Sequence, residues 1–514
     1  MVDDWLSESV SDGAKSVIVL GSIDRLTISE LSKEFSMGIL LFSSKKETIS
    51  PLPKELTFID RKESASVIKE KLENFMLLDY DSPPTVKVSK SISDESTSEY
   101  NKILDLTISE IDSTMRARRT RSETGYLRQR QVFVNLAGYL TKRIPTEWNG
   151  LAQGSLAVVV GAGPSLDVTL PFLKSGIPKP IIVASDSSLT ALRSANLNPD
   201  FVVSIDPQKT FESCSEEGYS PGIAVLSSQS HESWSKKWGK NCCYLSGRII
   251  TEDWLTEKGI SKTDVIAINN AGLTALMVAN FLNPSAILTL GMDLSGGGAG
   301  QERYAKNTNR AHVQIFASHY HKIPGNFSDT VTTPFLSDWQ ETSAFCRKIS
   351  ENKTIINLND RGAKLEGATL VHPDQVEELK NVLNQIIKPF NSEELVLLNK
   401  RKSLRGLGLN QLLCQLTTIC DSIWDTFPKQ ENENNAILLN FLRETLADHD
   451  KAKLLGDFAF SVMPIISPEK EPTPLELKGF SKEIETLIWK LEDAILECNP
   501  EDDFLSRFFT EKFN

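Results

Sequence analysis

The stretch LAVVVGAGPSLD, residues 156–167, decides how this chain folds. An apolar run rich in valine ends at a turn bracketed by Gly161 and Gly163, and a helical pattern begins after Ser165. A buried strand, a tight turn and a helix together form the first unit of a parallel α/β sheet. Glycine lets the backbone approach a ligand closely, and Pro164 fits the first turn of a helix. Free N–H groups of this turn and the Ser165 hydroxyl would then face a phosphate.

Strand and helix patterns alternate through the middle of the chain. Short apolar runs predict strands at residues 157–160, 181–184, 201–205, 223–226, 265–268, 286–290 and 354–357. Helical patterns such as SSLTALRSANL (187–197) and AGLTALMVANFL (271–282) lie between several of them. Near-continuous apolar strands are typical of a parallel sheet that is covered on both faces. We therefore predict the α/β class, with a central doubly wound, mostly parallel, Rossmann-like sheet.

The length of 514 residues exceeds what one hydrophobic core supports, so several domains are expected. Residues 1–95 hold short apolar runs around a helical stretch, which predicts a small α/β domain. Residues 96–150 are helical in pattern and form a connector. The Rossmann-like domain is expected over 151–375, and 376–514 contain only helical patterns, which predicts an all-helical C-terminal domain.

Composition limits the class of partner and the compartment. The net charge of −12 and the pI near 5.3 give no support for nucleic-acid binding. The seven cysteines are odd in number and lack the regular spacing of a disulfide framework. Free thiols of this kind are typical of proteins in a reducing compartment. The start of the sequence is acidic and resembles no signal peptide, and no apolar run reaches the roughly 18 residues that a membrane span needs. We expect a cytoplasmic protein without a membrane span.

Small polar or acidic residues follow nearly every predicted strand. In an open doubly wound sheet, ligands bind in the crevice beyond the carboxyl ends of the strands, so these residues are candidates for a site. They are Gly161, Gly163, Pro164 and Ser165 after the first strand, Asp186 and Ser187 after the second, Asp206 after the third, Asn269 and Asn270 after the fifth, and Asp293 after the sixth. Each one singly is also a common helix cap, but together they favour a polar ligand cleft.

Other kinds of site remain open at this point. Gly161 and Gly163 with Asp186 suggest a dinucleotide fingerprint, although Leu166 occupies the third glycine position. His312, His319 and His321 have a spacing that could hold a metal, but such residues more often form a polar loop or supply one acid or base. Paired CxxC motifs and the Walker A motif are absent from the sequence.

Five segments, taken in order, resemble the central domain of the Maf proteins, the motility-associated factors that glycosylate bacterial flagellin. The segments are VVVGAGPSLD (158–167), IIVASDSSLTALRSANLNPDFVVSIDP (181–207), NNAGLTALMVANFLNPSAILTLGMDLS (269–295), HKIPGNFSDTVTTPFLSDW (321–339) and IINLNDRGAKLEGATLV (355–371). The resemblance covers about 150–375, and its core is also similar to bacterial sialyltransferases that use CMP-sialic acid.

The resemblance implies transfer of a nonulosonic acid, of the pseudaminic or legionaminic type, from its CMP-activated donor to Ser or Thr hydroxyls of flagellin. Flagellin and a flagellin export chaperone are the implied partners, and whether a divalent metal takes part is left open. By position, the turn from Gly161 to Ser165 would line the CMP phosphate. Asp186, Ser187 and Asp206 would hold ribose, cytosine or sugar hydroxyls. Asn269, Asn270 and Asp293 would lie at the donor sugar or the base.

Such a transfer needs a general base for the acceptor hydroxyl and donors that stabilise charge on the departing CMP. The backbone N–H groups at 163–166 could supply these donors. Asp206, Asp293, His319 and His321 are candidates for the base, and Asp206 could equally hold a sugar hydroxyl. The glycine-rich stretch at 295–305 could close over the sugar, or it could be an ordinary surface loop.

Two further functions compete with this one. The same core occurs in an archaeal pterin pyrophosphokinase, which binds ATP and a pterin and would need Mg²⁺ held by carboxylates such as Asp186 and Asp206. The long flanking regions favour an enzyme that holds a protein substrate. The third possibility is a non-catalytic flagellin-binding assembly factor that keeps the fold.

Overall fold

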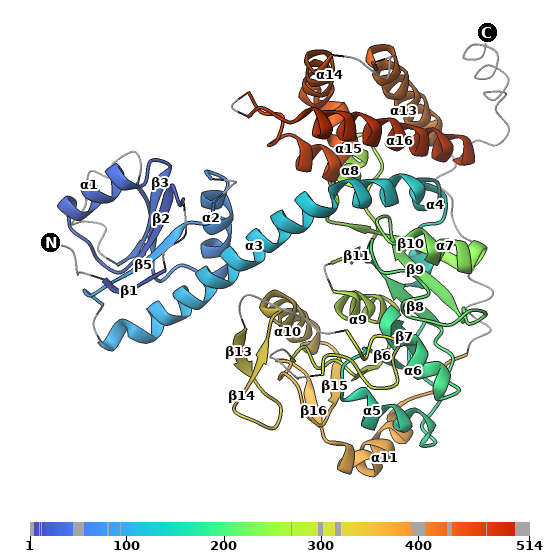
Figure 1. Cartoon of the computed structure of the whole chain (residues 1–514). Helices are drawn as coiled ribbons and strands as arrows, with labels where there is room; N and C mark the ends of the chain where they lie inside the picture. Colours follow the sequence, from blue (N-terminus) through green and yellow to red (C-terminus); the bar gives the residue numbers. More distant parts are fainter. Residues whose placement is uncertain are drawn as a thin grey trace, which may run out of the picture. The chain divides into compact units, whose positions relative to one another are not determined.

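The computed structural model describes residues 5–9, 11, 13–44, 56–79, 82–92, 94–268, 270–296, 302–313, 320–391, 407–428, 434–468 and 470–498. The chain divides into two compact units, Met1–Thr120 and Arg121–Asn514 (Figure 1). Each unit has hydrophobic cores of its own.

The N-terminal unit is built on a five-stranded sheet with the order β1-β5-β2-β3-β4. Its strands are β1 (Trp5–Ser9), β2 (Ser16–Leu20), β3 (Gly38–Ser43), β4 (Leu56–Asp60) and β5 (Thr85–Ser89). β1 runs antiparallel to β5, and the other pairs are parallel. Val17 and Val19 face α1 (Arg25–Glu34), whereas Ile18 and Leu20 face α2 (Ala65–Met76) and α3 (Asp94–Val134). The predicted α/β character of this region is confirmed.

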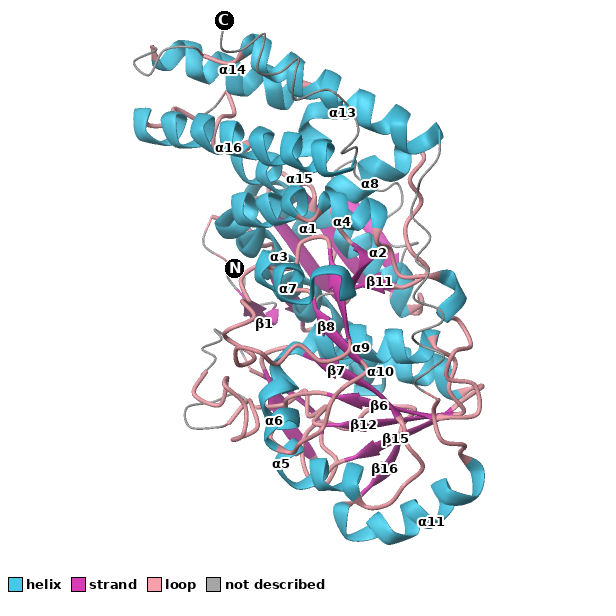
Figure 2. Cartoon of the chain, turned by 90° about the vertical axis from the view of Figure 1, so that its right-hand side faces the viewer, coloured by secondary structure: helices cyan, strands magenta, loops and turns pink. Residues whose placement is uncertain are grey.

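The larger unit contains a nine-stranded sheet in which every pair of neighbouring strands is parallel. The strand order is β11-β10-β9-β8-β7-β6-β12-β15-β16, and Figure 2 shows β8 to β16 following one another in this order. The strands are β6 (Leu156–Val160), β7 (Ile181–Ser185), β8 (Phe201–Ser204), β9 (Ile223–Ser227), β10 (Cys242–Gly247), β11 (Ile266–Ala267), β12 (Ala286–Leu290), β15 (Thr354–Leu358) and β16 (Thr369–Val371).

Helices cover both faces of this sheet, as the continuous apolar strands predict. The α-helices around it are α4 (Leu136–Thr141), α5 (Leu166–Thr169), α6 (Leu189–Ser194), α7 (Glu232–Trp238), α8 (Ile250–Glu257), α9 (Ala271–Phe281), α10 (Leu336–Ser350) and α11 (Val376–Ile386). Ala157 and Val159 of β6 pack with α9 and α10, whereas Val158 and Val160 pack with α5, α6 and α11. The predicted doubly wound parallel sheet is confirmed.

Short elements complete this part of the chain. The 3₁₀ helices are η2 (Thr146–Trp148), η3 (Leu170–Lys174), η4 (Asp186–Ser188), η5 (Gly239–Asn241) and η6 (Pro373–Gln375). A separate antiparallel hairpin is formed by β13 (His321–Pro324) and β14 (Thr330–Thr333).

The described C-terminal residues are helical, as predicted. The helices are α13 (Leu407–Thr426), α14 (Asn435–Ala447), α15 (His449–Val462) and α16 (Pro474–Cys498). Their core is continuous with the sheet layer, because Leu455 and Leu487 belong to the same apolar cluster as Leu226 of β9. Arg128 of α3 adds an ion pair with Asp457, 2.6 Å between Nε and Oδ2. Among the described residues we find no helix with the length and apolarity that a membrane span requires.

Two strands of the sheet, β10 and the three-residue edge strand β16, were missed, and one is shorter than predicted. β10 has the sequence CCYLSG, and its two cysteines were interpreted as free thiols. A buried cysteine behaves as a small apolar residue, so the run Cys242–Leu245 carried a strand signal after all. The strand predicted over 265–268 narrows to the two residues of β11, which pairs only with the end of β10.

The chain reverses its direction of winding between β6 and β12. From β6 the sheet grows through β7 towards β11, and on the other side of β6 it grows through β12 towards β16. β6 and β12 are neighbours in the sheet, and the chain leaves them toward opposite sides. The turns after these two strands therefore lie at a topological switch point. They touch there: a methyl group on Gly161 would lie 2.4 Å from the carbonyl oxygen of Gly291.

Gly161→Ala is expected to lower the free energy of unfolding by about 1–3 kcal/mol, because the new methyl group meets backbone that cannot move without disturbing two strands. Gly479→Ala in α16 is the matched control, since open space surrounds that position and alanine favours a helix by up to about 1 kcal/mol. Urea unfolding of both variants measures the difference. Equal stability of the two variants would contradict the close contact of the turns.

Candidate functional site

A cavity of about 280 Å³ lies at the switch point, beyond the carboxyl ends of β6, β7, β8 and β12. Its walls also include the start of α9, residues of the segment 302–313 and the start of α10. Seven residues predicted from the sequence line it, namely Gly161, Gly163, Asp186, Ser187, Asp206, Asn270 and Asp293. The strand-end pattern therefore located one connected polar site.

The remaining candidates lie elsewhere. Pro164 lines a neighbouring cavity of about 460 Å³ that shares Asp293 and Ser295 with the first. Ser165 is fully buried beneath the turn. Asn269 and His319 lie outside the described residues.

The histidines take different positions from one another. His312 is exposed, and His321 is buried on β13. The residue that follows His321, Lys322, lines the larger cavity. Among the described residues, neither His312 nor His321 lines either cavity.

The N–H groups of the β6 turn are used inside the protein. Gly163 N donates to Gly291 O at 2.8 Å, Ser165 N donates to Asp293 Oδ2 at 2.8 Å, and Leu166 N donates to Gly163 O at 2.9 Å. Pro164 has no N–H group. The expectation that N–H groups at 163–166 are free for a phosphate is therefore wrong. The physical reason is that the Asp293 carboxyl group and the backbone carbonyls of Gly291 and Gly163 already accept from these N–H groups.

Asp293 is the residue that joins the turns. Its Oδ2 accepts from Ser165 N, and its Oδ1 accepts from Asn359 Nδ2 at 2.8 Å. A methyl group on Gly163 or on Gly362 would collide with Asp293. Burial raises the pKa of Asp293, and the hydrogen bonds from Ser165 and Asn359 oppose this rise. Because both oxygens are engaged, Asp293 holds the turns after β6, β12 and β15 together.

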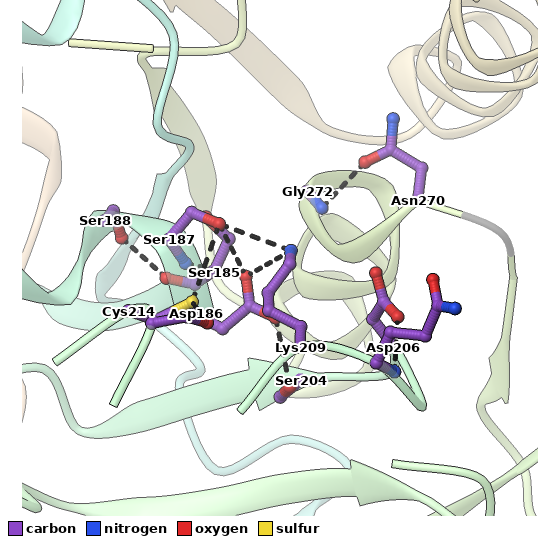
Figure 3. Close-up of polar contacts among 12 residues, drawn as sticks. Ser185, Asp186, Ser187, Ser188, Ser204, Asp206, Lys209, Cys214, Asn270 and Gly272 are labelled. Atoms are coloured by element: carbon purple, nitrogen blue, oxygen red, sulfur yellow. Dashed lines mark hydrogen bonds and ion pairs between the residues drawn. The ribbon is translucent and has the colours of Figure 1, made fainter. Parts of the chain in front are cut away.

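Asp186 is also engaged on both oxygens, as Figure 3 shows. Its Oδ1 accepts from Ser187 N at 2.6 Å and from Lys209 Nζ at 2.9 Å, and its Oδ2 accepts from Ser204 Oγ at 3.0 Å. Burial lowers the pKa of Lys209, but the Asp186 carboxylate and further neighbours such as Asp206 together outweigh burial and raise it. Asp186 therefore holds a charged ammonium group at the cavity wall.

Lys209 was missed by the sequence analysis. It follows Asp206 by three residues in the stretch DPQK, so a basic residue just beyond a polar strand end was the available signal. Its side chain is 13% exposed and lines the cavity.

Asp206 and Asn270 also line the cavity, and each accepts a hydrogen bond from a nearby backbone N–H group (Figure 3). Asp206 is partly exposed, and its Oδ1 accepts from Gln208 N at 2.9 Å. Asn270 Oδ1 caps α9 by accepting from Gly272 N at 2.8 Å. Among the three predicted aspartates, Asp206 alone has an accessible carboxylate.

Arg303, Tyr304 and Arg310 form another wall of the cavity and were also missed. Arg303 and Tyr304 end the glycine-rich stretch and Arg310 follows it, all in irregular backbone, where no periodicity marks a functional residue. The expectation that 295–305 closes over a sugar falls partly on residues 297–301, which lie outside the described residues.

Comparison with known proteins identifies one family model. Residues 131–297 match the MptE-like family, described as 6-hydroxymethylpterin diphosphokinase MptE-like. The similarity to this family that the sequence motifs indicated is confirmed over this range, which contains β6 to β12 and their turns.

A solved structure and the curated proteins complete the comparison. The chain is similar to the MAf glycosyltransferase from Magnetospirillum magneticum AMB-1, at 15% identity and a TM-score of 0.48, over 98% of this chain and 80% of that one. No curated protein matches the chain.

Lys209→Met is expected to lower the free energy of unfolding by about 3–5 kcal/mol, because it leaves the buried Asp186 carboxylate without a counter-charge. The double variant Asp186→Asn/Lys209→Met should lose less than the sum of the two single variants. Urea unfolding of the three variants and the wild type measures the interaction free energy between Asp186 and Lys209.

Lys236→Met is the matched control, since the ammonium of Lys236 is exposed and its pair with Glu232 is expected to contribute less than about 1 kcal/mol. A loss in Lys209→Met no larger than that of the control would show that the buried pair does not form.

Proposed function

We propose that this chain is a glycosyltransferase that moves a nonulosonic acid, of the pseudaminic or legionaminic type, from a CMP-activated donor to Ser or Thr hydroxyls of flagellin. The observation that carries the proposal is the cavity at the switch point, where seven predicted strand-end residues meet three basic side chains. The motif resemblance to the Maf proteins supports the choice of donor and acceptor. We also propose that the reaction takes place in the cytoplasm, with a flagellin export chaperone as a further partner.

The donor carries a leaving phosphate next to a sugar carbon that gains positive charge in the transition state. Catalysis therefore requires cations that stabilise the departing phosphate. Lys209, Arg303 and Arg310 line the cavity and can serve this purpose. Asp186 acts through Lys209, since it fixes the ammonium group in place and keeps it charged.

The acceptor hydroxyl needs a base within reach. Asp206 suits this role best, because its carboxylate is partly exposed at the cavity while those of Asp186 and Asp293 are occupied by hydrogen bonds. His321 is buried on β13, where Lys322 takes the position at the larger cavity. We assign general-base catalysis to Asp206.

The second candidate is an ATP-dependent pterin diphosphotransferase, favoured by the description of the matching family. That reaction needs Mg²⁺ between the phosphates. Asp186 would have to release Lys209 and Ser204 to bind the ion, which counts against this alternative. A non-catalytic flagellin-binding factor is the third candidate.

Calorimetric titration with CMP, CDP, ATP plus Mg²⁺, and NAD⁺ separates these candidates. Selective binding of CMP or CDP is the result expected of the proposed function. Binding of ATP and Mg²⁺ alone would favour the diphosphotransferase, and binding of none of them would favour the assembly factor.

Asp206→Asn is expected to lower the rate of sugar transfer to flagellin by about 10²–10⁴-fold while CMP binding persists, since only the base is lost. The control Asp253→Asn changes an exposed carboxylate that pairs with Lys262 away from the cavity, and it should transfer at the wild-type rate. Transfer rates of the two variants with a CMP-nonulosonate donor test the assignment. A wild-type rate in Asp206→Asn would overturn it.

A further inference from the structure

Two guanidinium groups flank one aromatic ring in the wall of the switch-point cavity. The Cζ atom of Arg303 lies 5.1 Å from the centre of the Tyr304 ring and 4.2 Å from that of Phe335. The Cζ atom of Arg310 lies 5.4 Å from the same Tyr304 ring. The rings hold the planar groups in place without neutralising their charge.

Neither arginine has a close counter-charge among the described residues. The structure contains no ion pair within 4 Å for Arg303 or Arg310 in that part of the chain, and the buried Nε of Arg310 has no hydrogen-bond partner there. Burial lowers the pKa of Arg303, and the nearby charge of Arg310 lowers it further. Both guanidinium groups are half-buried, and two like charges that lack a contacting anion repel each other, so this pair is suited to an anion from outside.

The acidic residues of the cavity are separated from this pair. Asp186 is neutralised by Lys209, and Asp293 lies at the turns with both oxygens engaged. Asp206 and Asp338 act on Arg303 through longer-range attraction. The lining thus provides a cationic wall for an anionic group and, in Asp206, a separate accessible carboxylate for hydroxyl groups.

We propose that Arg303 and Arg310 form the phosphoryl-binding subsite of this cavity, with Tyr304 as the platform that orients them. The inference rests on the proposed function only in placing the substrate in this cavity. The N–H groups at 163–166 of the turn after β6 do not compete for the phosphoryl group, because they already donate within the protein. Guanidinium groups bind phosphate through paired, charge-assisted hydrogen bonds.

The experiment compares binding of inorganic pyrophosphate, CMP and cytidine to the full chain and to Arg303→Ala and Arg310→Ala. Loss of a charge-assisted hydrogen bond predicts an affinity for pyrophosphate and for CMP that falls about 10- to 100-fold in each variant. Cytidine, which has no phosphate, should bind the variants as it binds the wild type. Arg303→Lys, which keeps the charge, should lose less than Arg303→Ala and covers the case in which alanine impairs folding.

Arg193→Ala is the matched control. Arg193 also lies over a tyrosine ring, 5.5 Å from the centre of Tyr219, but it pairs with Glu216 and does not line the cavity. Wild-type affinity for pyrophosphate and CMP in the folded Arg303 and Arg310 variants would overturn the inference, as would an equal loss in Arg193→Ala. Arginine-dependent binding of pyrophosphate without any binding of CMP would leave the subsite standing and refute the CMP-dependent function.

Discussion

The hydrogen bond from Ser165 N to the Asp293 carboxylate is the interaction on which the rest of the site depends. It joins the turn after β6 to the turn after β12, the two strands between which the sheet reverses its direction. Glycine is needed at 161 and 163 because any side chain would collide with Gly291 or with Asp293 itself. Asn359, in the turn after β15, donates a hydrogen bond to the same carboxylate, so one buried group fixes three strand ends.

This junction determines where a ligand can bind. Because Asp293 fills the space at the helix start, the N–H groups at 163–166, which would face a phosphate in many nucleotide-binding sheets, are already engaged. The cavity instead relies on side chains from more distant segments. Lys209 is held charged by Asp186 at one wall, and Arg303 with Arg310 lies at another. The proposed chemistry follows from this division, with cations for the leaving phosphate and Asp206 for the acceptor.

The sequence predicted those parts of the fold and of the site that depend on local patterns. Apolar runs with polar ends placed β6 to β9 and β12, and the parallel order brought the end residues of β6, β7, β8 and β12 to one cavity. The role of each site residue was not predictable from the sequence. The carboxylates of Asp293 and Asp186 accept hydrogen bonds from residues far away in the sequence, such as Asn359 and Lys209. Arg303 and Arg310 follow irregular backbone, where no periodicity indicates which way a side chain faces.

The most direct test of the account is a crystal structure of the protein with bound CMP, in which the position of the phosphorus atom is read. The account predicts the phosphate within hydrogen-bonding distance of the Arg303 and Arg310 guanidinium groups, with Asp293 still accepting from Ser165 N. A phosphate bound to the backbone N–H groups at 163–166, with Asp293 displaced from the turn, would contradict it.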